Sequence, residues 1–559
     1  DEEMSNLERA NVYQEVAEDS LPSWDPVRRA ASELVDMMWV LKVKLNELRE
    51  RVRFKARATV RGDQETAVDL ARGLKPAESF APTIRHNTLK LLIASGVVKA
   101  ANLETVPMHC VYKTKPNPMR MHSFDITAAF LQGDAPNDRV RFVRPPAGYQ
   151  RYDRRGIRIV WRLTGNVYGT TTAPRVFNQT LHNFLVGAVS EDSAKLNLTD
   201  VESWPSGSNI TGGLGMTQSA LDPCYYFKIY PNGTRMDTGV YVDDGWTLDT
   251  AGALADHDLA LLHRRFGITL NQSPSHFLGM NVKVHSPTRV TLTQEAYILQ
   301  MADRYVPDWR ERKEVMMPAT DALIKAYDVA HRREHDVSPA LIKTYGSKVG
   351  ALIYTTPCIR ADACAAIGRC SRALTFPTEE MSTLCDDIIV YLAQTASLGV
   401  TFDGHADRAS EIYGETDSDW AVGHSTTGWC LYLAGAAVCY RSQRQPCIAM
   451  SSTEAEIIAA SAGAIELVNC KALLAEMGLP QGVSCLYVDN SGAVELSRDR
   501  KSCHRSRHVD RRFFKVRELS YEGVLRVEHI DTKLNSSDLL TKPLTWALFE
   551  AHRRRLFNM

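Results

Sequence analysis

The stretch Gly239-Val-Tyr-Val-Asp-Asp-Gly-Trp-Thr-Leu248 places two adjacent carboxylates, Asp243 and Asp244, between two short runs of β-forming residues. An Asp-Gly pair between such runs is typical of a tight β-hairpin. The hairpin would hold both acids at an exposed tip, anchored by strands in a core. Because like charges at this spacing repel each other, the pair is easier to explain if a cation binds there. A solvated turn without a ligand is the alternative.

Upstream, Phe124-Asp125-Ile-Thr-Ala-Ala-Phe130-Leu-Gln-Gly133 is an apolar run interrupted by one acid. With this segment followed later by the Tyr-Val-Asp-Asp turn, the chain strongly resembles the reverse transcriptases of copia-type LTR retrotransposons. The resemblance implies a right-hand polymerase of fingers, palm and thumb, in which Asp125, Asp243 and Asp244 form the catalytic carboxylate triad. Such a triad would bind two Mg²⁺, with Mn²⁺ as an alternative, and these ions would clamp the attacking and leaving oxygens.

The same resemblance assigns residues that would bind substrates. Lys55 and Arg57, in the basic stretch Arg53-Phe-Lys-Ala-Arg57, would meet the incoming triphosphate. Phe130 would lie under the sugar and reject a 2′-hydroxyl, with ordinary core packing as the alternative. Gly169, between Tyr168 and a threonine run, would let the backbone approach template or nucleotide closely. A primer grip is expected at Phe277, Leu278, Gly279 and Met280.

A second set of acids begins at Asp417, in Tyr413-Gly-Glu-Thr-Asp-Ser-Asp-Trp420. Three alternating strands are followed by alternating helix and strand, with acids at strand ends and helix starts, which predicts an RNase H-like mixed sheet. The copia-type RNase H domain resembles this region in four segments. The resemblance implies that two Mg²⁺ would be bound by Asp417, Glu456, Asp489 and Asp538. These ions would serve the cleavage of the RNA strand in an RNA–DNA hybrid.

Two of these acids have rivals close by in the sequence. Asp419 competes with Asp417, but the family's Asp-x-Asp-Trp pattern favours the first acid. Glu454 competes with Glu456, whose following apolar residues match the helix register better. Glu456 also stands at capping-box spacing from Thr453, so a capping carboxylate is its structural alternative.

Composition is that of a globular protein. The 559 residues are enough for three or four domains, with 44% apolar and 24% charged residues. No apolar run approaches the roughly 18–20 residues of a membrane span, and no signal peptide heads the chain. The 12 Cys lack zinc-type spacing, which favours reduced thiols in an intracellular protein. Near Cys503, His504 and His508 no second Cys pair stands at zinc spacing, so a basic surface segment is favoured there.

The formal net charge is zero, yet basic residues concentrate in 42–61 and 498–517. Two such blocks are the pattern expected of a groove that follows phosphates, with a solvated basic face as the alternative for either. The first residue is Asp, so we expect a fragment or a processed piece of a longer product. Residues 201–216 are expected to be a flexible insertion, and 102–121 a long loop.

These observations predict a multidomain α/β (α+β) protein with a right-hand polymerase followed by an RNase H-like domain. We expect a disordered leader at 1–23 and the reverse transcriptase at 24–305. Within the latter, residues 24–40 are expected to form a helix. A linker and connecting helices at 306–405, of which 306–345 is irregular, would follow. The RNase H-like domain would occupy 406–545, and a C-terminal tail 546–559.

The expected function is DNA synthesis on RNA and DNA templates, joined to hybrid-specific RNA cleavage. Expected partners are an RNA template, a DNA primer, RNA–DNA hybrid and dNTPs, with dimerisation or integrase association as further expectations and no membrane. By the resemblance, the protein would act in cytoplasmic virus-like particles with later nuclear access. Alternatives are a decayed or domesticated copy that binds nucleic acid without catalysis, and a polymerase whose C-terminal domain is only structural.

Overall fold

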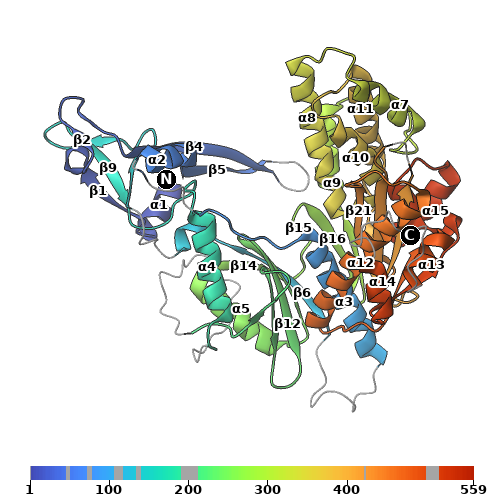
Figure 1. Cartoon of the computed structure of the whole chain (residues 1–559). Coiled ribbons are helices and arrows are strands. Elements are labelled where there is room, and N and C mark those ends of the chain that lie inside the picture. The colour runs from blue at the N-terminus through green and yellow to red at the C-terminus, as the bar shows by residue number, and fades with distance from the viewer. Residues whose placement is uncertain are drawn as a thin grey trace. The chain divides into compact units, whose positions relative to one another are not determined.

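The computed structural model describes residues 2–45, 51–71, 73, 78–105, 118–133, 140–189, 212–420, 423–498 and 515–559. The chain divides into two compact units, one of Asp1–Ile84 with His122–Gln272 and one of Arg85–Met121 with Ser273–Met559. Both units combine helices with β-sheets (Figure 1), so the chain has the mixed α/β character that the sequence predicts.

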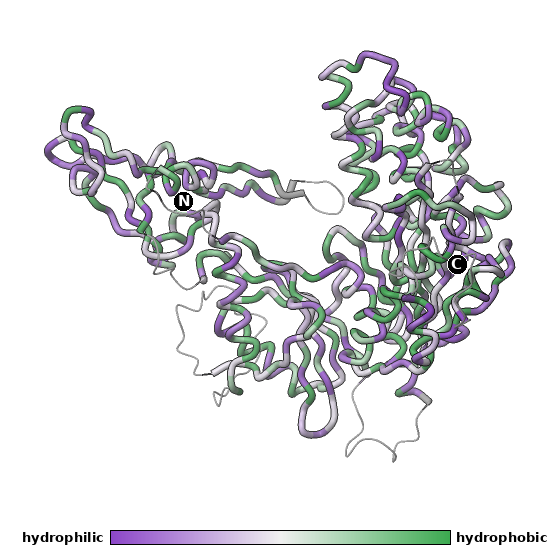
Figure 2. Tube along the Cα trace, viewed as in Figure 1, coloured by the Kyte–Doolittle hydropathy of each residue, from purple (hydrophilic) through white to green (hydrophobic). Residues whose placement is uncertain are grey.

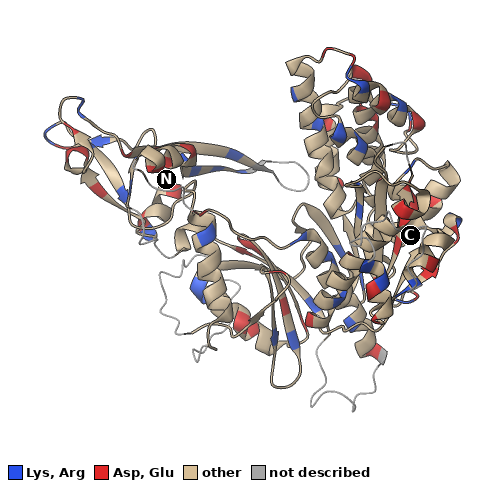
Figure 3. Cartoon of the chain, in the orientation of Figure 1, with Lys and Arg blue, Asp and Glu red and all other residues tan. Residues whose placement is uncertain are grey.

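The first sheet of the first unit carries a long basic hairpin. Its strands run in the order β1 (Tyr13–Ala17), β9 (Arg158–Leu163), β7 (Arg141–Arg144), β4 (Leu34–Leu45) and β5 (Arg51–Val60), and β8 (Arg151–Tyr152) pairs with β9. β4 and β5 are antiparallel, with Met37 opposite Val60 and Lys42 opposite Lys55. Figure 3 shows Lys and Arg along this hairpin. Helices α1 (Glu2–Arg9) and α2 (Gly62–Ala71) accompany the sheet.

The N-terminal expectations are wrong at two places. Residues 1–23 do not form a disordered leader, because α1 buries Met4 and Leu7 and β1 pairs with β9 along its whole length. The helix expected over 24–40 is replaced by β2 (Trp24–Asp25), β3 (Ala30–Ala31) and β4. In β4 burial alternates, with Val35 and Met37 inside the core and Met38 outside, which is the period of a strand.

The second sheet of the first unit has the order β10 (Thr217–Gln218), β11 (Tyr225–Ile229), β12 (Arg235–Tyr241), β13 (Asp244–Asp249), β6 (Arg120–Ile126) and β14 (Ile268–Asn271). Helices α4 (Ala173–Val186) and α5 (Ala253–Phe266) supply buried apolar side chains to its core. Phe124 of β6, Phe177 of α4 and Phe266 of α5 belong to one cluster. The predicted hairpin at Asp243 is therefore anchored by a packed sheet.

The second unit opens with a small sheet and a group of helices. Its strands are β15 (His276–Phe277), β16 (Met280–Ser286), β17 (Arg289–Thr293) and β18 (Val400–Asp403). Between β17 and β18 lie α6 (Glu295–Tyr305), α7 (Asp321–Arg332), α8 (Pro339–Ile353), α9 (Thr355–Cys358), α10 (Cys364–Arg372) and α11 (Glu379–Gln394). The irregular stretch expected over 306–345 instead contains α7 and the first turns of α8, which bury Leu323 and Tyr345.

The other sheet of the second unit is the mixed sheet that the sequence predicts. Its order is β21 (Ala436–Arg444), β20 (Thr426–Leu433), β19 (Tyr413–Asp419), β22 (Ser484–Val488) and β23 (Leu525–His529). The first three strands are antiparallel, whereas β22 is parallel to both β19 and β23. Helices α12 (Ser452–Glu476), α13 (Ser491–Arg498) and α14 (Lys515–Tyr521) accompany the sheet.

Two helices complete this unit. The early helix α3 (His86–Thr105) contacts β18, β21 and α12, and it buries an almost continuous apolar run that includes Leu89, Ile93 and Val97. Figure 2 shows the hydropathy of these segments along the chain. The C-terminal tail expected at 546–559 is instead α15 (Trp546–Phe557), which buries Phe549, Leu556 and Phe557.

Of the helices described, α12 alone is long and apolar enough to cross a membrane by length and composition. In its most apolar window 61% of the residues are buried inside the unit, which is the property of a core helix. Several expectations fall on residues outside the described ranges, namely most of the 102–121 loop, the 201–216 insertion and the 498–517 basic block, with Cys503, His504 and His508.

Candidate active sites

The predicted hairpin is present between β12 and β13, but the Asp-Gly pair expected to form its turn lies in β13 instead. Tyr241 pairs with Asp244, so Val242 and Asp243 form the turn, and Val242 adopts a left-handed φ of 57°. This conformation is costly for a β-branched residue, and such strain collects at functional sites. The following Gly245 pairs with Val240, and a Cβ added to it would lie 2.0 Å from Cζ of Phe124. The turn sequence therefore fits this place in the core only with glycine after the second acid.

Strand β6 brings Asp125 to the same turn. The Ile126 N–H donates a hydrogen bond of 2.8 Å to the carbonyl of Asp243. At the other end of the neighbouring strands β6 and β13, His122 Nε2 lies 3.1 Å from Asp249 Oδ2, and both side chains are buried. Asp125 is exposed, and Asp243 and Asp244 are half-buried. The three predicted acids therefore share one end of neighbouring strands. Among the described residues, however, their carboxylate oxygens do not all lie within 4.8 Å of one another, as the ligand atoms of two other groups do.

A pocket of about 470 Å³ lies beside the turn that follows β6, and its lining includes Lys55, Thr127, Ala128 and Tyr168. Tyr168 connects the predicted residues, because the Arg57 guanidinium lies 4.9 Å and the Phe130 ring 5.8 Å from its ring centroid. Burial raises the pKa of Tyr168 to about 12, and the negative charges of Glu3, Asp243 and Asp125 act in the same direction. The contacts of Tyr168 with both Arg57 and Phe130 were not predicted from the sequence.

Two expectations meet a structural explanation here. Phe130 packs on Phe177 with ring centroids 6.3 Å apart, so it contacts the apolar core as well as Tyr168. Gly169 has a φ of 87°, and a Cβ there would lie 2.1 Å from the Val60 carbonyl oxygen. The close backbone neighbour that requires glycine is therefore β5. The contacts of Phe130 with the sugar and of Gly169 with template or nucleotide stay predictions.

The predicted primer grip forms the β15–β16 hairpin of the second unit. Phe277 pairs with Met280, and Leu278 and Gly279 turn with φ values of 49° and 72°. Tyr354 Oη donates a hydrogen bond of 3.0 Å to the Leu278 carbonyl. Phe277 and Met280 are buried, so the residues on both sides of the turn are packed in the interior. Its role toward a primer stays a prediction.

The second set of acids converges in the mixed sheet. Asp417 lies on β19, Asp489 directly follows β22, and Asp538 lies on the short 3₁₀ turn η7 (Ser536–Leu540). One carboxylate oxygen of each lies within 4.8 Å of the others. Glu456 on α12 accepts hydrogen bonds from the Ser418 N–H at 3.1 Å and the Ser418 hydroxyl at 2.9 Å.

The electrostatics of this cluster favour a bound cation. Burial raises the pKa of Glu456 well above its usual range, and the charges of Asp417 and Asp489 reinforce the shift. Burial and Asp417 also raise the pKa of Asp489, and that of Asp538 to about 8. Glu456 Oε2 is buried without a hydrogen-bond partner among the described residues. Carboxylate oxygens in this state are suited to Mg²⁺.

Two neighbours that the sequence analysis passed over complete the cluster. Lys542 Nζ lies 3.1 Å from Asp538 Oδ1 and 3.8 Å from Asp417 Oδ1. The Thr541 hydroxyl donates a hydrogen bond to Asp417. Both residues follow Asp538 within one turn, and this proximity is the signal that could have identified them. Lys542 supplies a positive charge where the acids need one.

The rival acids have structural partners. Asp419 accepts a hydrogen bond from the Thr426 N–H and lies 3.8 Å from Arg369. Ser451, and not Thr453, caps α12, since its hydroxyl accepts from the Glu454 N–H at 3.2 Å. Glu454 in turn accepts from the Met450 N–H at 2.7 Å. Glu454 is therefore the capping carboxylate, and Glu456 faces the other acids.

One further buried acid, Glu415 on β19, was not singled out from the sequence. It pairs with Arg555 of α15 and accepts a hydrogen bond of 2.8 Å from the Ser536 N–H. These contacts tie β19 to α15 and to the 3₁₀ turn that carries Asp538. Glu415 therefore positions the cluster from outside it.

Residues 24–197 match the family model for reverse transcriptase (RNA-dependent DNA polymerase). The chain is 26% identical over 554 residues to the retrovirus-related Pol polyprotein from transposon TNT 1-94 of Nicotiana tabacum, covering 98% of this chain and 37% of the relative. It is 26% identical over 536 residues to that from transposon RE1 of Arabidopsis thaliana, covering 94% and 32%. The chain therefore spans about a third of the length of these curated relatives.

Among solved structures, a foamy viral protease-reverse transcriptase in complex with RNA/DNA hybrid is similar with a TM-score of 0.42 and 10% identity, over 89% of this chain and 50% of that one. The family model and the relatives both point to a retrotransposon polymerase region. The chain is a relative of the Pol polyproteins of retrotransposons over almost its whole length, and residues 24–197 match the reverse transcriptase family.

Proposed function

We propose that this chain synthesises DNA on RNA and DNA templates and cleaves RNA in RNA–DNA hybrids. The observation that carries the proposal is the pair of acid sites in a Pol relative. Asp125 lies beside the Asp243-Asp244 turn in the first unit, and Asp417, Asp489 and Asp538 converge in the second. Each unit thus offers one carboxylate site suited to divalent cations.

In the polymerase site, Asp125, Asp243 and Asp244 would hold two Mg²⁺, or Mn²⁺ in their place. When bound, such ions stabilise the charge that develops on the attacking and leaving oxygens. Lys55 and Arg57 add positive charge beside the pocket for the triphosphate of a dNTP. Phe130 would exclude a 2′-hydroxyl, and the turn at Phe277–Met280 would fix the primer by backbone contacts.

In the hydrolytic site, Asp417, Glu456, Asp489 and Asp538 would hold two Mg²⁺ for cleavage of the RNA strand. Two properties of these side chains support cation binding. The unpartnered oxygen of Glu456 and the raised pKa values of the buried carboxyls both call for a cation. Lys542 offsets part of the negative charge and would remain close to the phosphates of the substrate.

The proposed partners follow from this chemistry and are an RNA template, a DNA primer, the hybrid and dNTPs. Dimerisation or association with integrase belongs to the same proposal and would be measured by light scattering and by co-purification. We further propose an intracellular site of action, in cytoplasmic particles with later nuclear access. Fractionation of cells that express the intact element would locate the chain.

Primer extension on a labelled RNA template, with Mg²⁺ and dNTPs, tests both activities in one tube. We expect the intact chain to extend the primer and shorten the RNA. Asp243→Asn should abolish extension and leave cleavage of a preformed hybrid, whereas Asp489→Asn should do the reverse. Asp407→Asn, which neutralises an exposed acid of the second unit outside both sites, is the matched control.

Three outcomes would separate the alternatives. A folded chain that binds hybrid but neither extends nor cleaves would contradict the proposal and favour a domesticated binding protein. Extension without RNA cleavage would identify a polymerase whose C-terminal domain is structural. Extension that survives Asp243→Asn would show that the catalytic acids lie elsewhere.

A further inference from the structure

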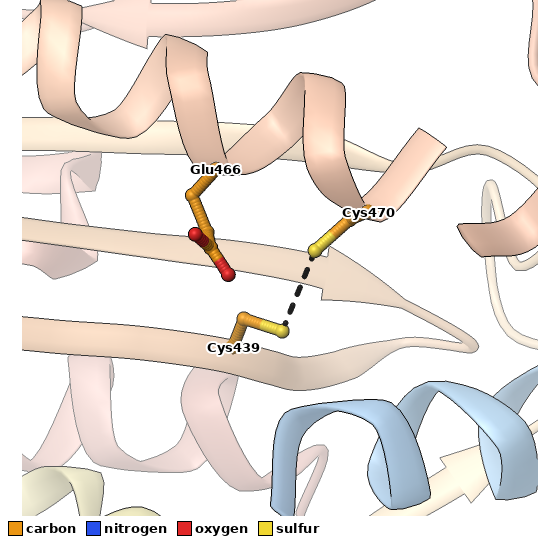
Figure 4. A group of neighbouring side chains, drawn as sticks. All are labelled: Cys439, Glu466 and Cys470. Atoms are coloured by element: carbon orange, nitrogen blue, oxygen red, sulfur yellow. Dashed lines mark hydrogen bonds between the residues drawn. The ribbon is translucent and has the colours of Figure 1, made fainter. Parts of the chain in front are cut away.

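A second group of ligand-type side chains lies in the core of the second unit, away from the four acids. Cys439 is on β21, and Glu466 and Cys470 are one turn apart on α12, so both helix residues face the strand. Cys439 Sγ and Cys470 Sγ are 3.6 Å apart. One ligand atom of each of the three residues lies within 4.8 Å of the others, and Figure 4 shows the side chains pointing toward one another.

The spacing of the two sulfurs matches that of thiolates that share a metal ion. In a tetrahedral zinc site each Zn–S bond is about 2.3 Å, which separates two sulfurs by about 3.8 Å. The observed 3.6 Å is close to this value without any movement of β21 or α12. Two thiolates and one carboxylate are also a donor set that soft and borderline cations prefer to Mg²⁺.

In the described part of the chain, no positively charged side chain pairs directly with the carboxylate of this group. Within the described residues, the Glu466 carboxylate has neither a hydrogen-bond donor nor a basic side chain as its partner. Both thiols are fully buried, and Glu466 is half-buried. A divalent cation would bind the thiolate forms and displace their protons to solvent.

Nearby charge is consistent with one divalent ion. Lys90 of α3 is fully buried, and its ammonium has no hydrogen-bond partner among the described residues. Burial lowers the pKa of Lys90, while negative charge on Cys439 and Cys470 acts to raise it. Two thiolates, one carboxylate, one ammonium and one divalent cation together carry no net charge, which is the condition that a buried site favours.

We propose that Cys439, Glu466 and Cys470 bind a thiophilic divalent cation of the Zn²⁺ class, which fastens α12 to β21. Binding replaces two S–H bonds by two metal–sulfur bonds, and two protons leave to solvent with no change of oxidation state. The half-buried side of Glu466 gives the ion its access. Because α12 also carries Glu456, the ion would stabilise the helix that serves the hydrolytic site without taking part in hydrolysis.

Co²⁺ is the probe for this site, because its thiolate complexes absorb in the near ultraviolet whereas its carboxylate complexes do not. Full-length protein, reduced and stripped of metal, should take up one Co²⁺ with this charge-transfer band and lose the band when Zn²⁺ is added. Cys439→Ser and Cys470→Ser should abolish the band. Cys447→Ser, at a half-buried thiol of the same domain outside the group, should leave it unchanged.

Glu466→Gln keeps the proposal testable if a buried Cys variant does not fold, because this side chain is half-buried and nearly isosteric. It should weaken Co²⁺ binding by more than about tenfold, since a direct ligand contributes at least as much as an outer one. Zn²⁺ should raise the melting temperature of the intact chain and of Asp489→Asn alike, but that of Glu466→Gln far less.

Two results would overturn the assignment. One is the absence of a thiolate-to-cobalt band in the folded, reduced chain, or a band that survives both Cys→Ser variants. The other is a Zn²⁺ effect on melting that Asp489→Asn removes and Glu466→Gln retains, because the ion would then belong to the acid cluster. Neither result depends on whether the chain extends primers or cleaves hybrids.

Discussion

Gly245 is the residue that allows the acid-bearing turn to lie against the core. An added Cβ would meet the Phe124 ring at 2.0 Å, and strand pairing holds both backbones in place, so the ring would have to move. We expect Gly245→Ala to lower stability by about 1–3 kcal/mol, as overpacking does, and to reduce primer extension by displacing Asp243 and Asp244. Urea unfolding and extension assays would measure both effects.

Gly482→Ala is the control for this substitution, because a Cβ there meets nothing within 4 Å. Its unfolding midpoint should stay close to that of the unaltered chain. A Gly245→Ala variant with unchanged stability and unchanged extension would show that the Phe124 ring moves aside at little cost.

His552 makes stability depend on pH. Burial lowers the pKa of His552 from its ordinary value of 6.5 to about 4, and the positive charges of Arg555 and Lys542 act in the same direction. Between these values the unfolded chain binds the proton more readily, so this contribution to stability is complete above about pH 6.5 and is lost as the pH falls through about 4. His552→Gln cannot take up that proton.

We therefore expect the melting temperature of the intact chain to fall more than that of His552→Gln between about pH 7 and about pH 4. Carboxylates titrate in both proteins, so the difference between the two curves isolates the histidine. Parallel curves would mean that His552 titrates alike in the folded and unfolded chains.

Some residue assignments could be predicted from the sequence and others could not. The register of apolar residues after Glu456 favoured it over Glu454, and the structure places Glu454 at the cap and Glu456 toward Asp417. The sequence did not point to Tyr168, because its partners Arg57 and Phe130 lie on different elements and local spacing carries no record of them. Lys542 was passed over although its place four residues after Asp538 is a local signal.

At the scale of elements, local periodicity was the deciding signal. Strands β19, β20 and β21 follow one another with short connections, so their antiparallel pairing in the mixed sheet could be predicted. Helix α1 and strand β1 could not, because α1 has eight residues and β1 pairs with β9, far away in the sequence. Their stability comes from tertiary contacts that no local pattern encodes.

Helix α1 should therefore contribute measurably to the first unit. Leu7 is 1% exposed in the cluster that also contains Val35, Met37 and Trp161. We expect Leu7→Ala to cost about 2–5 kcal/mol of unfolding free energy, the usual range for a buried leucine. Leu254→Ala, at a side chain 42% exposed on α5 of the same unit, should cost far less in the same urea titration. Equal effects would mean that α1 is not packed in solution.

At the scale of the whole molecule, 66 basic residues balance 66 acidic ones, so binding of polynucleotide must rest on local charge. Strand β5 carries Arg53, Lys55 and Arg57 on the hairpin that Figure 3 shows to be basic. We expect hybrid affinity to fall linearly with the logarithm of salt concentration, and Arg53→Gln with Lys55→Gln to reduce that slope by about 2.

Arg28→Gln, at a side chain 85% exposed elsewhere in the first unit, is the control for the salt titration and should leave the slope unaltered. Fluorescence anisotropy with a short labelled hybrid would supply the affinities. A slope that the β5 variant does not change would place the phosphate contacts on other residues.

Helix α3 has a consequence for the synthesis of the chain. Its apolar residues are complete by Thr105, but β18, β21 and α12, which contact it most, begin at Val400 or later, roughly 300 residues on. At translation rates of about 5–20 residues per second, this separation corresponds to roughly 15 to 60 s. Every newly made molecule thus passes through an interval in which a finished apolar helix waits uncovered, exposed to chaperones and to neighbouring chains on the same message.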